Sequence, residues 1–375
     1  MEALRIYKTN NRIGKIKKTS IVIFQMLIVF SCFGQNTENG WTEDKLIGKV
    51  KSYTEIGYKA KNRFGKIEKI KKLRILDPNN NFQKKYDEKG NLIEFNRYNS
   101  DGKFIFKEIY KYDEKGNRIE ENWYNSDSSL ELKYSYKYDE KGNQIEKNRY
   151  ISDSSLVYKN IYKYDEKGNL IEFNSCNSDG KFIFKEIYKY DEKGNQIEFN
   201  SCNSDGKFIF KNIYKYDEKG NQIEKNRYIS DSRLDYKNIY KYDEKGNRIE
   251  SNWYNSDGSL EIKEIYKYDE RGNRIEYNSC NSDGSLKYKY SYIYDEKGNR
   301  IEFNSYNSDG KLNSKYSYDE KENLIEKNWY NSDSSLNYKY SYKYDYDEKG
   351  NWITKIYFKN QIPLYMLERT YEYYE

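Results

Sequence analysis

Apolar and charged residues alternate along most of this chain, in stretches of about nine residues or fewer that short polar clusters separate. One stretch has the sequence FIFKEIYKY (104–112), and the next has RIEENWY (118–124). A period of two is typical of β-strands with one half-buried face. The clusters, Asp-Glu-Lys-Gly and Asn-Ser-Asp-Gly, favour tight turns because Asp or Asn bonds the following backbone and glycine takes positive φ without steric penalty. The pattern therefore predicts antiparallel strands joined in a meander.

The pattern is a tandem repeat. The segment Tyr-Asp-Glu-Lys-Gly-Asn, or a one-letter variant, occurs eleven times, with its first tyrosine at 86, 112, 138, 164, 190, 216, 242, 268, 294, 318 and 346. A fixed period of 26 residues indicates one two-hairpin unit copied along the chain. We expect an all-β fold of about 22 strands that curls or spirals, because twisted open sheets rarely exceed about ten strands. Whether the sheet closes, spirals or stays open is not decided by the repeat.

Charge along the repeat suggests a strand register. Each copy has a Glu after its Ile and a Lys thirteen residues later, as in Glu94 and Lys107. If the two are directly opposite, the turn is a four-residue loop and the pair stabilises the hairpin by roughly 0.2–1 kcal/mol. This register gathers Ile119 and Trp123 on one apolar face, which we expect on the concave side. The last two intervals, 24 and 28, differ from 26 by two and so preserve the faces.

The turns tolerate substitution. Ser128, Ser154, Ser232 and Ser334 replace the glycine of the second cluster, and Glu322 replaces the glycine of the first. A residue with a Cβ must then occupy the positive-φ position. We interpret the tips as surface features rather than as a site.

The first 34 residues have the order of a secretory signal. Basic residues through Lys18 precede an apolar run at 21–30 and then Ser-Cys-Phe-Gly. The apolar run is too short for a good membrane-spanning helix. We expect cleavage between Gly34 and Gln35, with lipidation of Cys32 as the alternative, and hence a bacterial protein that is secreted or held at the cell surface. Beyond the signal we expect three parts: degenerate N-terminal strands at 35–80, the repeat array at 81–355 and a C-terminal cap at 356–375.

Composition argues against several functions. The chain has no histidine, the commonest general base and metal ligand, and its repeated carboxylates lack the uniqueness of a catalytic pair. We therefore expect no enzyme activity, no cofactor and no metal. The net charge of +6 falls mostly on residues 1–34, and the near-neutral remainder predicts no nucleic-acid partner. Cys176, Cys202 and Cys280 fill a slot that other copies give to tyrosine, roughly 9–10 Å apart between copies and thus too far for disulfides.

Tyrosine is the most over-represented residue, at 45 positions. Within the repeat, one tyrosine slot falls on the polar face beside Asn and Glu, where exposed rings could stack on sugars or contact a protein. The candidate binding residues in this slot are Tyr124, Tyr150, Tyr228, Tyr254 and Tyr330. Trp123, Trp253 and Trp329 fall on the apolar face and are expected in the core.

The motif Tyr-Lys-Tyr-Asp-Glu-Lys-Gly-Asn-Arg-Ile, at 110–119 and 240–249, resembles the YD (Rhs-type) repeat. The resemblance covers roughly 80–355 and implies spiralling β-hairpin sheets in bacterial secreted and cell-surface proteins, some suspected of binding carbohydrate. Large members form hollow shells around toxic C-terminal domains, and this chain is far shorter. Tyr-Asn-Ser-Asp-Gly-Ser-Leu at 254–260 more weakly resembles MORN-type repeats, some of which are antitoxin-like.

Together these features predict an exported, non-enzymatic β-repeat protein, structural or binding, with a glycan or a surface protein as partner. Membrane contact is expected only through a lipid anchor. The alternative is an antitoxin or immunity-like protein that binds a partner toxin. Any function should lie in the variable slots between the motifs.

Overall fold

A computed structural model describes residues 39–73, 81–152, 154–230 and 232–375. The expected signal, with Cys32 and the bond between Gly34 and Gln35, lies outside these residues. The described part contains the short helix α2 (Gly40–Glu43) and a single 25-stranded sheet. The strands are β1 (Val50–Arg63), β2 (Lys66–Lys72), β3 (Phe82–Tyr86), β4 (Leu92–Tyr98), β5 (Phe104–Tyr112), β6 (Arg118–Tyr124), β7 (Leu130–Tyr138), β8 (Gln144–Ile151), β9 (Leu156–Tyr164), β10 (Leu170–Asn177), β11 (Phe182–Tyr190), β12 (Gln196–Asn203), β13 (Phe208–Tyr216), β14 (Gln222–Ile229), β15 (Leu234–Tyr242), β16 (Arg248–Asn255), β17 (Leu260–Tyr268), β18 (Arg274–Asn281), β19 (Leu286–Tyr294), β20 (Arg300–Tyr306), β21 (Leu312–Tyr318), β22 (Leu324–Tyr330), β23 (Leu336–Tyr346), β24 (Trp352–Lys359) and β25 (Ile362–Tyr373).

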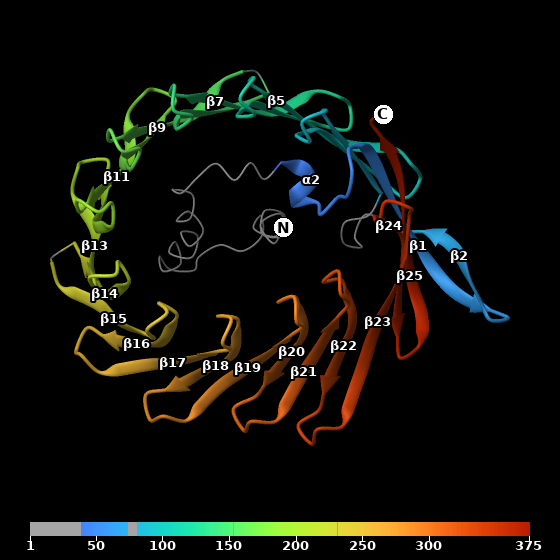
Figure 1. Cartoon of the computed structure of the whole chain (residues 1–375). Coiled ribbons are helices and arrows are strands. Elements are labelled where there is room, and N and C mark those ends of the chain that lie inside the picture. Colours follow the sequence, from blue (N-terminus) through green and yellow to red (C-terminus); the bar gives the residue numbers. More distant parts are fainter. Residues whose placement is uncertain (1–38, 74–80, 153, 231) are drawn as a thin grey trace, which may run out of the picture. The chain divides into compact units, whose positions relative to one another are not determined.

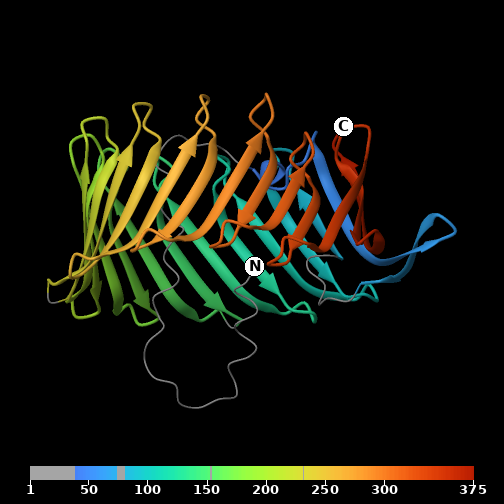
Figure 2. The ribbon, with the colours of Figure 1, turned by 90° about the horizontal axis from the view of Figure 1, so that it is seen from below.

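The sheet closes into a barrel. From β3 to β25 each strand pairs antiparallel with the next, and β1 pairs with β3 on one side and with β25 on the other. Strand β2 pairs with β1 alone and extends away from the ring (Figures 1 and 2). The predicted all-β meander of antiparallel hairpins is thus confirmed. The sheet is closed rather than spiralling, and closure pairs the two edge strands with each other so that neither edge of the ring stays open.

Each Asp-Glu-Lys-Gly turn is stabilised by hydrogen bonds from its own side chains. In the tip that follows β5, the Asp113 carboxylate accepts hydrogen bonds from the backbone N–H of Asn117 at 2.8 Å and from its side-chain amide at 2.9 Å. Gly116 has φ +88°, which glycine adopts without strain. The Asp, Gly and Asn of the motif are therefore explained by the turn itself.

Other letters of the motif connect neighbouring copies. Lys115 Nζ donates to the backbone carbonyl of Glu140 in the next tip, at 2.9 Å. The motif tyrosine Tyr138 donates through its hydroxyl to the carbonyl of Arg118, at 2.8 Å, and the same contact recurs in most copies. The motif is a folding signal: its residues build the turn and link it to the turns on either side.

The register differs from the predicted one by two residues. Glu94 lies opposite Ile109, and Lys107 lies opposite Asn96. The cause is that glycine at positive φ closes a three-residue loop and that a β-bulge follows in the adjoining strand. A shift of two keeps the side chains between the bulges on their predicted faces, so the ion pair still forms, diagonally, with Glu94 Oε2 3.1 Å from Lys107 Nζ.

The two faces of the sheet can be assigned to the inside and the outside of the barrel. Residues directly opposite in neighbouring strands share a face, and the pairs Tyr53–Lys84, Lys84–Phe95 and Phe95–Glu108 trace one face from β1 to β5. Trp41 of α2 packs against the buried cluster that contains Tyr53, and α2 lies inside the ring (Figure 1). This face is the inner wall. The opposite face, which carries the ion pair between Glu94 and Lys107, is the outer wall.

The two irregular intervals are absorbed within single strands. Strand β21 has 7 residues and β23 has 11, whereas the corresponding strands of regular copies have 9. The losses and gains of two residues leave the alternation of faces intact, as predicted.

Replacing Glu322 by glycine should stabilise the barrel by about 1 kcal/mol, because Glu322 has φ +59° where most copies have glycine. Its ion pair with Lys45, 3.8 Å long and exposed, contributes little and is lost at small cost. Urea unfolding measures the gain. The matched substitution Gly116→Ala, where an added Cβ meets nothing within 4 Å, should lose a similar amount. Equal stability of all three proteins would contradict the idea that backbone strain at this position matters.

Candidate binding surface on the inner wall

The outer wall carries one repeated ion-pair ladder. Glu120 lies 2.7 Å from Lys111 of the preceding strand and 2.7 Å from Lys133 of the following one, and the Asn122 amide donates to it at 2.8 Å. Partial burial alone would raise the pKa of Glu120, but these hydrogen bonds outweigh it and lower the pKa to about 2. The same contacts recur at Glu94, Glu146, Glu172, Glu198, Glu224, Glu250 and Glu276. A contact repeated so uniformly is structural.

The tyrosines selected as candidate binding residues lie on the outer wall, beside this ladder. Tyr124 is opposite Lys107 and Tyr150 is opposite Lys133, and all five are half-buried. They come from β6, β8, β14, β16 and β22. In β10 and β12, which lie between β8 and β14, the same slot holds Cys176 and Cys202. The tyrosines therefore form short groups rather than one continuous row. Their role in binding stays a prediction.

The cysteines in this slot are free thiols. Cys176 and Cys202 are buried, with exposed fractions of 5% and 4%, and burial raises the pKa of Cys202. Buried thiols of raised pKa are poor nucleophiles at neutral pH.

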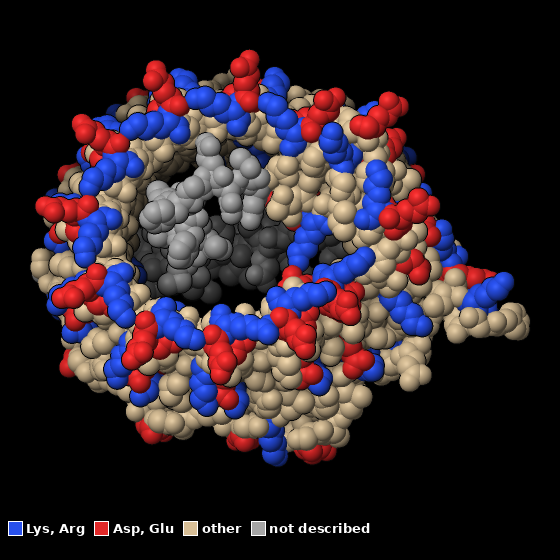
Figure 3. Space-filling model, in the orientation of Figure 1, with Lys and Arg blue, Asp and Glu red and all other residues tan. Residues whose placement is uncertain are grey.

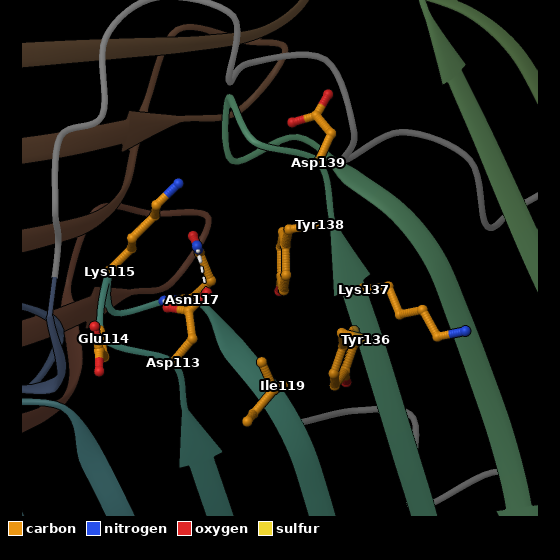
Figure 4. Close-up of a pocket in the computed structure, with 9 residues that line it drawn as sticks. All are labelled: Asp113, Glu114, Lys115, Asn117, Ile119, Tyr136, Lys137, Tyr138 and Asp139. Atoms are coloured by element: carbon orange, nitrogen blue, oxygen red, sulfur yellow. Dashed lines mark hydrogen bonds between the residues drawn. The ribbon is translucent and has the colours of Figure 1, made fainter.

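A shallow pocket lies between each of two pairs of neighbouring turns. One of them is shown in Figure 4, where Asp113 and Asn117 of one turn face Tyr136 and Tyr138 of the next strand across Ile119. The second has the equivalent residues six repeats further along the chain, around Ile275 and Tyr292. The lining residues are those that hold the turns together, so these pockets are a by-product of the repeat.

The variable slots of the repeat face inwards. In even-numbered strands from β4 to β22 two inner positions flank the constant Asn, as Glu121 and Trp123 do in β6. The first of these positions holds Phe95, Glu121, Lys147, Phe173, Phe199, Lys225, Ser251, Tyr277, Phe303 and Lys327 along the chain. The second holds Arg97, Trp123, Arg149, Ser175, Ser201, Arg227, Trp253, Ser279, Ser305 and Trp329. The tryptophans expected in a core are only half-buried on this wall.

Cations on the inner wall lie against aromatic rings. Lys147 Nζ is 4.8 Å from the centre of the Tyr134 ring, and Arg227 is 4.0 Å from that of Phe210. At this distance a cation is attracted by the ring's negative face. Burial lowers the pKa of Lys147 and of Lys327, because a desolvated ammonium group is less stable than a hydrated one.

The richest of these groups lies near the seam where the ring closes. Lys355 of β24 is 5.5, 5.2 and 5.0 Å from the rings of Tyr342, Tyr344 and Tyr357. Burial lowers the pKa of Lys355 to about 8. Lys359, on the same strand, is 5.2 Å from the ring of Tyr338. The seam therefore presents ammonium groups framed by tyrosines.

Charges on the inner wall are unevenly paired. The carboxylates are all engaged: Glu121 accepts from Trp123 Nε1 at 2.6 Å and from Arg118, and Glu264 accepts from Tyr266 and Tyr277. Within the described residues, ten inward cations have no carboxylate within 4.0 Å, namely Arg97, Lys147, Arg149, Lys225, Arg248, Arg274, Arg300, Lys327, Lys355 and Lys359. The wall therefore has an excess of positive charge.

The lumen is too wide for its side chains to fill. Strands spaced by about 4.8 Å give a ring of 24 strands a backbone diameter of about 37 Å, and side-chain layers of about 5 Å leave roughly 27 Å. Figure 3 shows the mouth of this hollow, ringed by basic and acidic side chains. The inner wall is thus a concave surface that can surround a large ligand.

Sequence reasoning found the variable slots and expected the face that carries Trp123 on the concave side, but it did not predict that this face is basic. The signal was present, since these slots alternate with the outward Glu and Asn of each copy. It was hidden by the overall charge, because inner cations and acidic turns cancel in the total. Among the residues that the structure describes, no three His, Cys, Asp or Glu side chains gather to hold a metal ion, and no helix is long and apolar enough to cross a membrane.

No family model matches the chain, and no curated protein matches it. Among solved structures, it is similar to the crystal structure of TcdB2-TccC3-Cdc42, with 12% identity and a TM-score of 0.31 over 76% of this chain. It is also similar to the Photorhabdus luminescens Tc holotoxin pore, with 12% identity and a TM-score of 0.29. The chain spans 19% of the length of both. A porin-like protein from Bacteroides uniformis matches over 64% of this chain and 95% of its own, with 10% identity and a TM-score of 0.24. Likenesses this weak carry no conclusion about what the chain binds.

Proposed function

We propose that the chain is an exported, non-enzymatic β-repeat protein that binds an acidic polysaccharide against the inner wall of its barrel. One observation carries the proposal: the repeat keeps its outer Glu–Lys ladder nearly constant, whereas the two inner positions beside the constant Asn vary, mostly among cations, aromatic rings and serine. Export is supported by the signal-like sequence of residues 1–34, and carbohydrate binding by the resemblance to YD repeats.

The chemistry of the wall suits this ligand. Tyrosine and tryptophan rings stack on the apolar faces of sugar rings, and ammonium and guanidinium groups form charge-assisted hydrogen bonds with uronate carboxylates. A concave wall with an excess of positive charge also concentrates anions. Burial partly desolvates Arg97, Lys147, Lys327 and Lys355, so pairing these four with carboxylates relieves part of the cost of their burial.

Binding of polygalacturonate, with dextran as the neutral comparison, tests the proposal by calorimetry. The wild-type chain should bind the acidic polymer only, and more weakly as salt rises. Replacing Lys327, Lys355 and Lys359 together by glutamine should weaken binding at least about tenfold. Binding should also fall between about pH 7 and 9, since Lys355, with its pKa of about 8, loses its charge over this range.

The matched control replaces three exposed lysines outside the lumen, Lys181, Lys207 and Lys287, by glutamine. It should bind as the wild type does. Loss of binding in Tyr124→Ala and Tyr150→Ala, with the inner-wall variant unaffected, would move the site to the outer wall. Capture of an acidic protein in place of the polysaccharide would favour the antitoxin-like alternative.

A further inference from the structure

The hairpin formed by β1 and β2 projects beyond the barrel. Strand β1 pairs with β25 only up to Lys59, and from Ala60 to Arg63 it pairs with β2 alone. Both views show this hairpin, in blue, extending away from the ring (Figures 1 and 2). Nearly every residue of β2 is exposed. The projecting part adds no strand pairing to the ring, and an ion pair of 2.6 Å links Lys69 at its base to Glu368 of β25.

The tip of the hairpin destabilises the folded state rather than stabilising it. Phe64 has φ +50° and is fully exposed, at 106% of the reference area. A bulky residue is strained in this conformation, and the two-residue turn it forms with Gly65 favours Asn-Gly. A phenyl ring that touches nothing gains no burial in return. Folding therefore gives no reason for phenylalanine at this position.

The strands behind the tip add like-charge repulsion. Lys59 lies directly opposite Lys71, and Arg63 lies directly opposite Lys66. Like charges across a ladder destabilise the pairing. From 59 to 72 the chain has seven basic residues and one acidic residue, Glu68, which pairs with Arg63 at 3.5 Å. The hairpin is thus a basic arm with an aromatic end.

We propose that this hairpin docks the protein on an anionic lipid bilayer, with Phe64 entering the membrane interface and the lysines behind it contacting lipid phosphates. Basic residues near a membrane surface are attracted by anionic lipids, and an apolar ring at the tip is buried only if the partner has an apolar layer. A soluble polyanion would satisfy the cations and leave the ring in water. The aromatic tip therefore favours lipid over a soluble polymer. This docking uses a different surface from the lumen and does not depend on the acidic polysaccharide proposed above.

Sedimentation of the full chain with vesicles tests the proposal. Vesicles of phosphatidylglycerol mixed with phosphatidylcholine should bind the chain, and vesicles of phosphatidylcholine alone should bind it far less. Phe64→Asn suits the turn and should fold at least as well, yet it should bind about tenfold more weakly. Replacing Lys59, Lys61 and Lys71 by glutamine should weaken binding about fivefold for each lysine removed. Every variant retains the basic, apolar residues 1–34, so only differences between variants are interpreted.

The matched control is Phe208→Asn, because Phe208 is also an exposed aromatic residue, at 53%, but lies on β13 of the ring. It should bind vesicles as the wild type does, and thermal unfolding should show all variants folded. Equal vesicle binding by Phe64→Asn and the wild type would overturn the proposal. So would release from the vesicles by soluble dextran sulfate that acts on wild type and Phe64→Asn alike, since the hairpin would then recognise charge alone.

Discussion

Replacing Arg369 by methionine should destabilise the barrel by about 3–5 kcal/mol, because it removes the partner of a buried carboxylate at the closing seam. Arg369 Nε lies 2.8 Å from Glu55 Oε2, across the pairing of β25 with β1, and the two side chains are 14% and 5% exposed. Burial raises the pKa of Glu55, and Arg369 opposes that rise. Without the guanidinium, the carboxylate must be buried unpaired or take up a proton.

Urea unfolding measures this loss, and hydrogen exchange locates it. Amides of β1 and β25 should exchange faster than those of β11, because the damage lies at the seam. The double substitution Glu55→Gln and Arg369→Met should recover part of the stability, since no charge is then left unpaired. A loss below about 1 kcal/mol in the single variant would show that the seam does not depend on the ion pair.

The barrel should unfold in acid at a higher pH than a β-protein without such a ladder of ion pairs. Eight outer-wall glutamates, Glu94 to Glu276, have their pKa lowered from 4.5 to about 2. A group with a lowered pKa stabilises the folded state above its unfolded pKa, and that contribution is lost as the pH falls through the folded pKa. Stability should therefore fall between about pH 4.5 and 2, by at least about 5 kcal/mol in total.

Urea midpoints at pH 7, 4 and 3, with proton uptake on unfolding, test this expectation. Glu120→Gln should be less stable than the wild type at pH 7 and should lose less stability on acidification. Its uptake should be smaller by about one proton. A midpoint that is the same at pH 3 and pH 7 would show that the ladder contributes no net stability.

Much of the architecture could be predicted because the repeat states it many times. The alternation of faces, the turn clusters and the tolerance of two-residue changes all follow from a period of two and from the properties of Asp, Asn and Gly. The register was missed by two residues because bulges are not visible in alternation. Ile119, for example, stands at the bulge and is 38% exposed, although its sequence context is that of a core residue.

Closure and the inner wall were harder to predict. Strand β1 lacks the motif, and nothing in its sequence names β25, more than 300 residues away, as its partner. The inner cations are visible only once alternation is combined with the knowledge of which face is concave. The tyrosines selected as candidate binding residues were chosen for exposure, and they are indeed on the outer wall beside the ladder. Phe64 had no signal at all, since a single aromatic residue outside the repeat looks ordinary.

The seam also sets an order of folding events. Within the array each hairpin forms from residues close in sequence, so strands can pair as soon as they are made or exported. The pairing of β1 with β25, which brings Val50 opposite Tyr373, cannot form until the last strand is present. Until then the array is an open, curved sheet with its inner wall accessible from the side. A ligand too large to pass through the opening of the barrel can be enclosed during synthesis, before β1 pairs with β25.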